Sequence, residues 1–300
     1  MGQFVKAVEV WIPGIRELRL ELGSAYYGEL ENFRHASEGM TFGLGEGLPG
    51  KTWEKGRPVI LKDLHDPLFQ RTEAADRAGL ACAVALPVFC GEFLQAVVVM
   101  YCGSETATGA LEVWHNPQQS DFELRLEDGY FGDLDRFEWI TRKLTIMRGR
   151  GLPGQAWSDA APVIIENLGE STAFLRASKA AEVGMTTGLA IPLSLREEDV
   201  QIFTLLSAKG TPIANRFEIW KPDSTRQSLE FVAGTAISGE NLMQRYSGQN
   251  GLKGGESALG QAWVTGRPAI HVGDFGDGAA FFALPVINQG ELAAVVGLVL

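Results

Sequence analysis

The sequence predicts an α+β protein in which one module of about a hundred residues is written three times. Three observations predict it: the same landmarks recur in the same order, each set opens on two short strands, and a glycine-rich turn leads into a short helix in each. The modules are expected at residues 1–104, 105–210 and 211–300. Such a period is too long for a solenoid unit and suits a small domain. Each module should therefore be an antiparallel sheet with short helices on one face.

Each module opens on a short strand that ends in a tryptophan. These strands are Val8–Trp11, Leu111–Trp114 and Phe217–Trp220. In the first two modules the next strand, 17–21 or 123–127, alternates leucine with charge, a pattern that buries one face and leaves the other in water. The final strands, 96–101, 200–206 and 292–300, are continuous apolar runs, so both of their faces should be covered.

A turn in the middle of each module leads into a short helix. The turns are Gly47–Trp53, Gly151–Trp157 and, more loosely, Ser257–Trp263. A proline in the first turn of a helix loses no hydrogen bond, and the tryptophan one turn later points inward. Gly56 and Gly266 are expected to end the first and third helices, after which a proline opens an apolar strand.

The first two modules carry a second, alanine-rich helix that the third lacks. Its head reads Phe69-x-Arg71 in the first module and Phe174-x-Arg176 in the second. The third module passes through 274–278 almost directly into its last hairpin. We therefore expect the third module to be a structural unit without a pocket of this kind.

These landmarks, taken in order, resemble the GAF domain family of small-molecule sensor modules. The resemblance covers nearly the whole chain and is most specific from Gly45 to Cys102. It implies an antiparallel sheet with a ligand pocket roofed by the two short helices. Members of the family bind cyclic nucleotides, bilins, haem, amino acids or nothing, so the resemblance leaves the cofactor or ligand unknown.

The long helices that flank a GAF sheet are missing from this chain. Only loop-length segments join the modules, so we expect the apolar backs of the sheets to cover one another, within the chain or in a homodimer. Short joints would also allow strands of neighbouring modules to pair. In that case the last strand, 295–300, would need the first strand, 7–11, as its partner.

Eight residues are candidates for the ligand pockets of the first two modules. They are Trp53, Asp63, Phe69 and Arg71, and Trp157, Asn167, Phe174 and Arg176. An arginine beside an aromatic ring could hold a carboxylate or phosphate by its planar fork. In the alternative reading the aromatic residues are core, which we favour, and each arginine pairs with a surface carboxylate.

Catalytic and metal motifs are weak. The stretch Gly45–Thr52 matches a phosphate-loop pattern, but the second module replaces Lys51-Thr52 by Gln155-Ala156, so the turn and not the phosphate ligand repeats. The four histidines have no ligand spacing, and we predict no metal site and no catalytic residue. Cys82 and Cys102 fall on the two arms of one hairpin and could be cross-strand neighbours; we favour buried small side chains over reactive thiols.

Composition limits the function further. The net charge is −11, which disfavours a nucleic-acid partner, and no apolar run approaches a membrane-spanning length. With three cysteines and no signal segment, a cytoplasmic protein is expected. The sequence thus favours a non-catalytic small-molecule-binding or regulatory protein that acts through ligand binding or protein assembly. The alternatives are a ligand-free scaffold and a thiol oxidoreductase of the methionine sulfoxide reductase type that uses Cys82 and Cys102.

Overall fold

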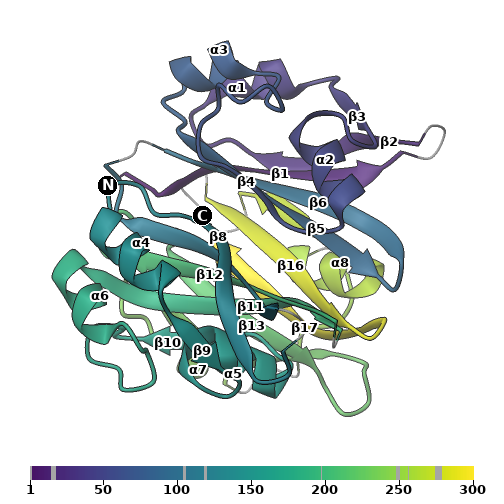
Figure 1. The fold of residues 1–300 in the computed structure, drawn as a ribbon. Coiled ribbons are helices and arrows are strands. Elements are labelled where there is room, and N and C mark those ends of the chain that lie inside the picture. Colours follow the sequence, from purple (N-terminus) through teal and green to yellow (C-terminus); the bar gives the residue numbers. More distant parts are fainter. Residues whose placement is uncertain are drawn as a thin grey trace.

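Three antiparallel sheets make up the fold, with short helices on the outer face of each (Figure 1). The computed structural model describes residues 2–14, 18–103, 106–117, 120–196, 198–247, 251–255, 257–273 and 279–300. No helix among these residues is long and apolar enough to cross a membrane. The expected start of the second strand at residue 17 and the loop 274–278 lie outside the described residues.

The first sheet has the strand order β3-β2-β1-β6-β5-β4. Its strands are β1 (Val5–Pro13), β2 (Arg19–Tyr26), β3 (Thr41–Gly43), β4 (Val59–Leu61), β5 (Cys82–Cys90) and β6 (Phe93–Cys102). Its helices are α1 (Glu31–Ser37), α2 (Gly47–Lys55) and α3 (Thr72–Arg77). Helix α2 ends at Gly56, which adopts the left-handed conformation that the sequence predicts.

The second sheet has the same order when read from its other edge, β9-β8-β7-β12-β11-β10. Its strands are β7 (Gly109–His115), β8 (Glu123–Tyr130), β9 (Thr145–Met147), β10 (Val163–Glu166), β11 (Met185–Arg196) and β12 (Asp199–Ala208). Its helices are α4 (Asp135–Arg142), α5 (Gly151–Asp159) and α6 (Ala177–Val183). Here Ala160 takes the left-handed position after α5, so the cap differs from Gly56, as predicted.

The third sheet is shorter by one strand and has the order β14-β13-β17-β16-β15. Its strands are β13 (Arg216–Pro222), β14 (Leu229–Ala236), β15 (Ala269–Val272), β16 (Ala280–Asn288) and β17 (Glu291–Val299), with helices α7 (Leu242–Tyr246) and α8 (Ala258–Thr265). Helices α1, α4 and α7 were not anticipated from the sequence. Of these three helices α7 alone has a side-chain cap, from Asn241, so the usual N-terminal signal is missing from α1 and α4.

The backs of the three sheets pack against one another in one shared core. Members from the three sheets include Leu86, Phe203 and Phe282, all fully buried. A separate cluster fills the space between each sheet and its own helices. The expectation that the backs cover one another is therefore met within the single chain, and this explains how the sheets dispense with long flanking helices.

Contacts between the sheets recur in cyclic order. Strand β4 contacts β8, β10 contacts β14, and β15 contacts β2, so each sheet meets both of the others. At the first junction Lys62 Nζ lies 2.8 Å from Asp128 Oδ1, and at the second the Thr235 hydroxyl donates to Glu166 Oε2 at 3.1 Å. Heterologous contacts that close in this way make a ring and leave no free end.

Among the described strands, none pairs with a strand of another sheet. Strand β1 pairs with β2 and β6, and β17 pairs with β13 and β16, all inside their own sheets. The ends of the chain are nevertheless close, since Phe4 N bonds Pro212 O and Asn215 N bonds Val299 O. The ring closes by packing and not by strand pairing, because a sheet back buries far more apolar surface than a shared edge.

We predict that Leu86→Ala lowers the free energy of unfolding by about 2–5 kcal/mol, because it opens a cavity in the shared core. The matched control Leu44→Ala removes a side chain that is 61% exposed and should change the free energy of unfolding by less than about 0.5 kcal/mol. Guanidinium denaturation followed by tryptophan fluorescence measures both. Because all three sheets share one core, the shifted transition should stay single; two transitions of which only one shifts would contradict the shared core.

Candidate functional site

A fully buried glutamate stands in the opening strand of every sheet, two residues before the strand's tryptophan. The three glutamates are Glu9, Glu112 and Glu218. Alternate residues of a strand share a face, so the indole nitrogen reaches the carboxylate on the same side of the sheet. The tryptophan Nε1 donates to it at 2.9, 2.9 and 2.8 Å respectively. A register shift precedes each tryptophan, so the local backbone is alike in the three strands.

In the first sheet the partner of the glutamate is Arg71, which stands just before helix α3. Its Nη1 lies 2.6 Å from Glu9 Oε1 and its Nη2 lies 3.0 Å from Glu9 Oε2, a bidentate ion pair. The Ser37 hydroxyl accepts a further bond from Nη1, and the Tyr101 hydroxyl both accepts from Nη2 and donates to Glu9. The arginine fork is therefore already occupied by a carboxylate of the same chain.

The second sheet repeats this arrangement with different hydroxyls. Arg176 forms a bidentate pair with Glu112, in which Nη2 lies 3.0 Å from Oε2. Thr141 accepts from the same guanidinium at 2.6 Å, and Thr204 donates to Glu112 at 2.8 Å. Both arginines are less than a tenth exposed. The sequence left open whether they bind a ligand; the structure places them on internal carboxylates.

The third sheet keeps the glutamate without the second helix. Arg216, from the same strand, brings its Nε to 2.6 Å from Glu218 Oε1. The Tyr246 hydroxyl from α7 donates to the same oxygen at 2.8 Å. The charge is thus neutralised locally where no F-x-R helix supplies an arginine.

The electrostatics of the clusters follow from burial and charge pairing. Burial raises the pKa of Glu9, but the charge and hydrogen bonds of Arg71, with bonds from two tyrosines, outweigh it and hold the pKa below its ordinary value. Burial raises the pKa of Tyr101, and burial with the charge of Glu218 raises the pKa of Tyr246 to about 12. The stability that ionised Glu9 contributes is therefore fully present at a pH above its unfolded pKa of 4.5. That contribution is lost as the pH falls through the lower pKa of the folded state.

The other candidate residues divide into core and surface. Phe69 and Phe174 are buried, and the ring centroids lie 5.6 and 5.0 Å from the neighbouring guanidinium carbons. Trp157 is buried and Trp53 half-buried among the residues between sheet and helices.

Asp63 and Asn167 are instead exposed and remain outside the ion-pair clusters. The Asp63 carboxylate accepts from the backbone and the ring of His65 at the surface. The glutamates were missed in the sequence, although a charge inside the apolar strand pattern at 8–11, 111–114 and 217–220 signals a buried partner.

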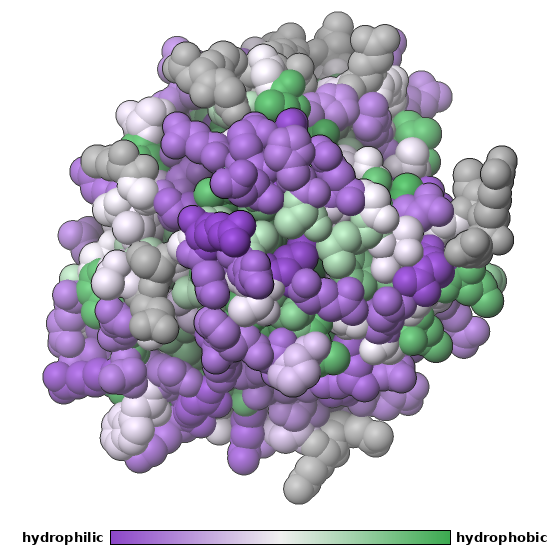
Figure 2. Space-filling view, turned by 90° about the horizontal axis from the view of Figure 1, so that it is seen from above, coloured by the Kyte–Doolittle hydropathy of each residue, from purple (hydrophilic) through white to green (hydrophobic). Residues whose placement is uncertain are grey.

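Two hollows remain beside these filled interiors. The helix cleft lies between α1 and α3, is about 700 Å³, and is lined by residues that include Asn32, Met40 and Arg77. Figure 2 looks onto the side of the molecule that carries these helices and shows a mainly hydrophilic surface with small separate apolar groups. The lining of the helix cleft itself mixes polar and apolar side chains.

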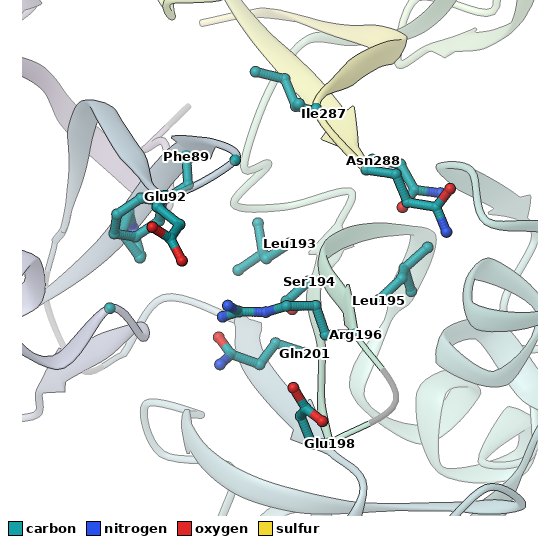
Figure 3. A pocket seen from close by; sticks show the side chains of 15 residues that line it. Phe89, Glu92, Leu193, Ser194, Leu195, Arg196, Glu198, Gln201, Ile287 and Asn288 are labelled. Atoms are coloured by element: carbon teal, nitrogen blue, oxygen red, sulfur yellow. The ribbon is translucent and has the colours of Figure 1, made fainter.

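The second hollow, the hairpin cavity, lies where one hairpin from each sheet converges (Figure 3). It measures about 730 Å³, within the usual range for small-molecule sites. The lining comes from Phe89, Gly91 and Glu92 of the first hairpin, Leu193–Arg196, Glu198 and Gln201 of the second, and Ile287–Gly290 of the third. No single module could form it, so a pattern within one module could not reveal it.

The cysteine pair has the placement that the hairpin predicts. Cys82 and Cys102 are direct cross-strand partners, and both are buried in the shared core. Burial and the neighbouring Cys102 raise the pKa of the Cys82 thiol well above its ordinary value. A thiol in this position is a poor nucleophile, because the thiolate is the reactive form. Within the described residues no group of three or more His, Cys, Asp and Glu side chains could hold a metal ion.

No family model matches the chain, and no curated protein does. Similar solved structures include the free methionine-R-sulfoxide reductase of Neisseria meningitidis with its substrate (16% identity, 33% of this chain and 52% of that chain, TM-score 0.27). They also include the A. aeolicus nlh2 GAF domain (21% identity, 33% of this chain and 58% of that chain, TM-score 0.27). A third is a GAF domain from a Coxiella burnetii phosphoenolpyruvate-protein phosphotransferase (16% identity, 33% of this chain and 56% of that chain, TM-score 0.28). The chain spans about half the length of these structures.

We predict that Arg71→Met lowers the free energy of unfolding by about 3–5 kcal/mol, because Glu9 is left buried without its counter-charge. The matched control Arg77→Met removes an exposed pair with Glu73 and should cost less than about 1 kcal/mol. Adding Glu9→Gln to Arg71→Met should restore part of the loss. Urea denaturation measures all three, and equal losses for Arg71→Met and Arg77→Met would contradict the internal pair.

We predict that a thiol reagent modifies only Cys90 rapidly in the native protein. Cys90 is partly exposed on its hairpin, whereas Cys82 and Cys102 should react only as the core opens. Mass spectrometry counts one fast label in the wild type, none in Cys90→Ser and three in denaturant. Fast labelling of Cys82 would contradict the buried-thiol assignment and support the oxidoreductase alternative.

Proposed function

We propose that this chain is a non-catalytic binding protein made of three GAF-like units, 1–104, 105–210 and 211–300, which holds a small molecule without transforming it. The observation that carries the proposal is the hairpin cavity of about 730 Å³, to which all three sheets contribute. The arginines at the heads of the second helices cannot carry it, because Arg71 and Arg176 are paired internally with Glu9 and Glu112. Each fork already spends two of its donors on a buried carboxylate and others on neighbouring hydroxyls, and both arginines are less than a tenth exposed. Ligand binding is therefore assigned away from Arg71 and Arg176.

The hairpin cavity is the better site for that ligand. It is concave and built by three sheets that the shared core holds together, and its lining mixes apolar side chains with polar and charged ones. Its volume suits a small molecule, and its polar groups could fix the orientation of one. Phe69, Arg71, Phe174 and Arg176 then serve as the interior of their units, with Trp53 and Trp157 beside them, while Asp63 and Asn167 are surface residues.

A ligand-free scaffold is the second candidate. The filled interiors of the first two sheets favour it, because self-occupied sites need no ligand to be stable. The two candidates differ in what the purified protein retains.

We predict that native mass spectrometry of the purified protein detects a retained small molecule that depends on the hairpin cavity. Asn288→Trp puts an indole into the cavity and should abolish retention, whereas the matched Asn32→Trp fills the helix cleft and should leave it unchanged. Circular dichroism checks that both variants are folded. Loss of the molecule in Asn32→Trp alone would move the site to the helix cleft, and no retained mass in any sample would favour the scaffold.

A further inference from the structure

The lining of the hairpin cavity is chemically uneven. Phe89, Leu193 and Ile287 give it an apolar part, while the charged residues come from two different hairpins. The first hairpin contributes Glu92, and the second contributes Arg196 and Glu198. A ligand that fits must therefore match apolar surface and both signs of charge.

Arg196 is held only loosely by its neighbours. Its Nη2 lies 3.4 Å from Asp199 Oδ2, and two thirds of its side chain is exposed. Asp199 is occupied by others: Gln201 Nε2 donates to both of its oxygens at 2.8 and 3.0 Å, and Arg57 pairs with it as well. Figure 3 shows the Arg196 guanidinium extending into the space between the hairpins. The fork can therefore accept a carboxylate from a bound molecule.

Glu92 offers the opposite charge across the same space. Figure 3 shows its carboxylate on the side of the first hairpin, turned toward the cavity. In the described part of the chain neither Glu92 nor Glu198 has an ion-pair partner, and Arg196 pairs with Asp199 alone. A purely anionic molecule would meet the two glutamates, and a purely cationic one would meet Arg196. Only a molecule with both charges satisfies both sides.

We propose that the hairpin cavity binds a small zwitterion with an apolar body, of the size of a dipeptide. Its carboxylate lies on Arg196, its ammonium group on Glu92, and its apolar side chains on Phe89, Leu193 and Ile287. A cavity of about 730 Å³ has room for such a molecule. This inference rests on the proposed function, since it names the ligand class of that same site.

The test uses three probes with one body: leucyl-phenylalanine, its N-acetyl derivative and its C-terminal amide. Isothermal titration calorimetry on the full-length protein should show binding of the free dipeptide and roughly tenfold or greater weakening for each capped form, since each loses a charge-assisted contact. The Asn288→Trp variant should bind none of them, and Asn32→Trp should bind as the wild type does.

Charge variants locate the two contacts. Arg196→Gln should weaken binding of the free dipeptide roughly tenfold but leave binding of the amide unchanged, because the amide has no carboxylate. Glu92→Gln should likewise weaken binding of the free dipeptide roughly tenfold but leave binding of the N-acetyl form unchanged, because that form has no ammonium group. The matched controls Arg77→Gln and Glu73→Gln replace residues that line the helix cleft, and they should leave binding of all three probes unchanged.

Each outcome separates the ligand class from the proposed function. A capped probe that binds as tightly as the free dipeptide, yet is lost in Asn288→Trp, overturns the zwitterion and leaves the cavity as a binding site. Absence of binding by all three probes overturns the zwitterion as well; only if native mass spectrometry also finds no retained molecule does the proposed function fall with it.

Discussion

The need to cover three apolar sheet backs determines the architecture. Each sheet buries one face under its own short helices, and the other face is as apolar as a core. A free sheet of this kind would expose far more apolar surface than a soluble monomer tolerates. Packing the backs together removes that surface at once, and the cyclic contacts of β4 with β8, β10 with β14 and β15 with β2 follow from it.

The filled interior of each unit follows from the cost of burying charge. A carboxylate without a partner in an apolar interior is strongly unfavourable, so Glu9, Glu112 and Glu218 each require a nearby cation. The first two recruit an arginine from the head of the second helix, and the third takes Arg216 from its own strand. The ion pair thus ties the helix to the sheet, which gives Arg71 and Arg176 a structural role that needs no ligand.

The sequence predicted what depends on local pattern and missed what depends on distant contacts. The left-handed caps at Gly56 and Gly266 and the Cys82–Cys102 pairing follow from turn chemistry and hairpin register. The partner of Arg71 did not, because Glu9 lies 62 residues away; the sequence left open whether this arginine holds a ligand or pairs with a surface carboxylate. Helices α1 and α4 were missed because they are short and carry no capping side chain.

The hairpin cavity arises where three similar backbones carry different side chains. The first and third hairpins turn over two residues, Gly91-Glu92 and Gln289-Gly290, and both turns use positive φ. The first turn is acidic and the third is an uncharged amide, while Arg196 stands at the second. A ring of identical units would place the same side chains at three equivalent positions and could not present Glu92 and Arg196 on different sides. Divergence at the hairpin tips, with the shared core unchanged, is what makes an asymmetric site out of a near-symmetric frame.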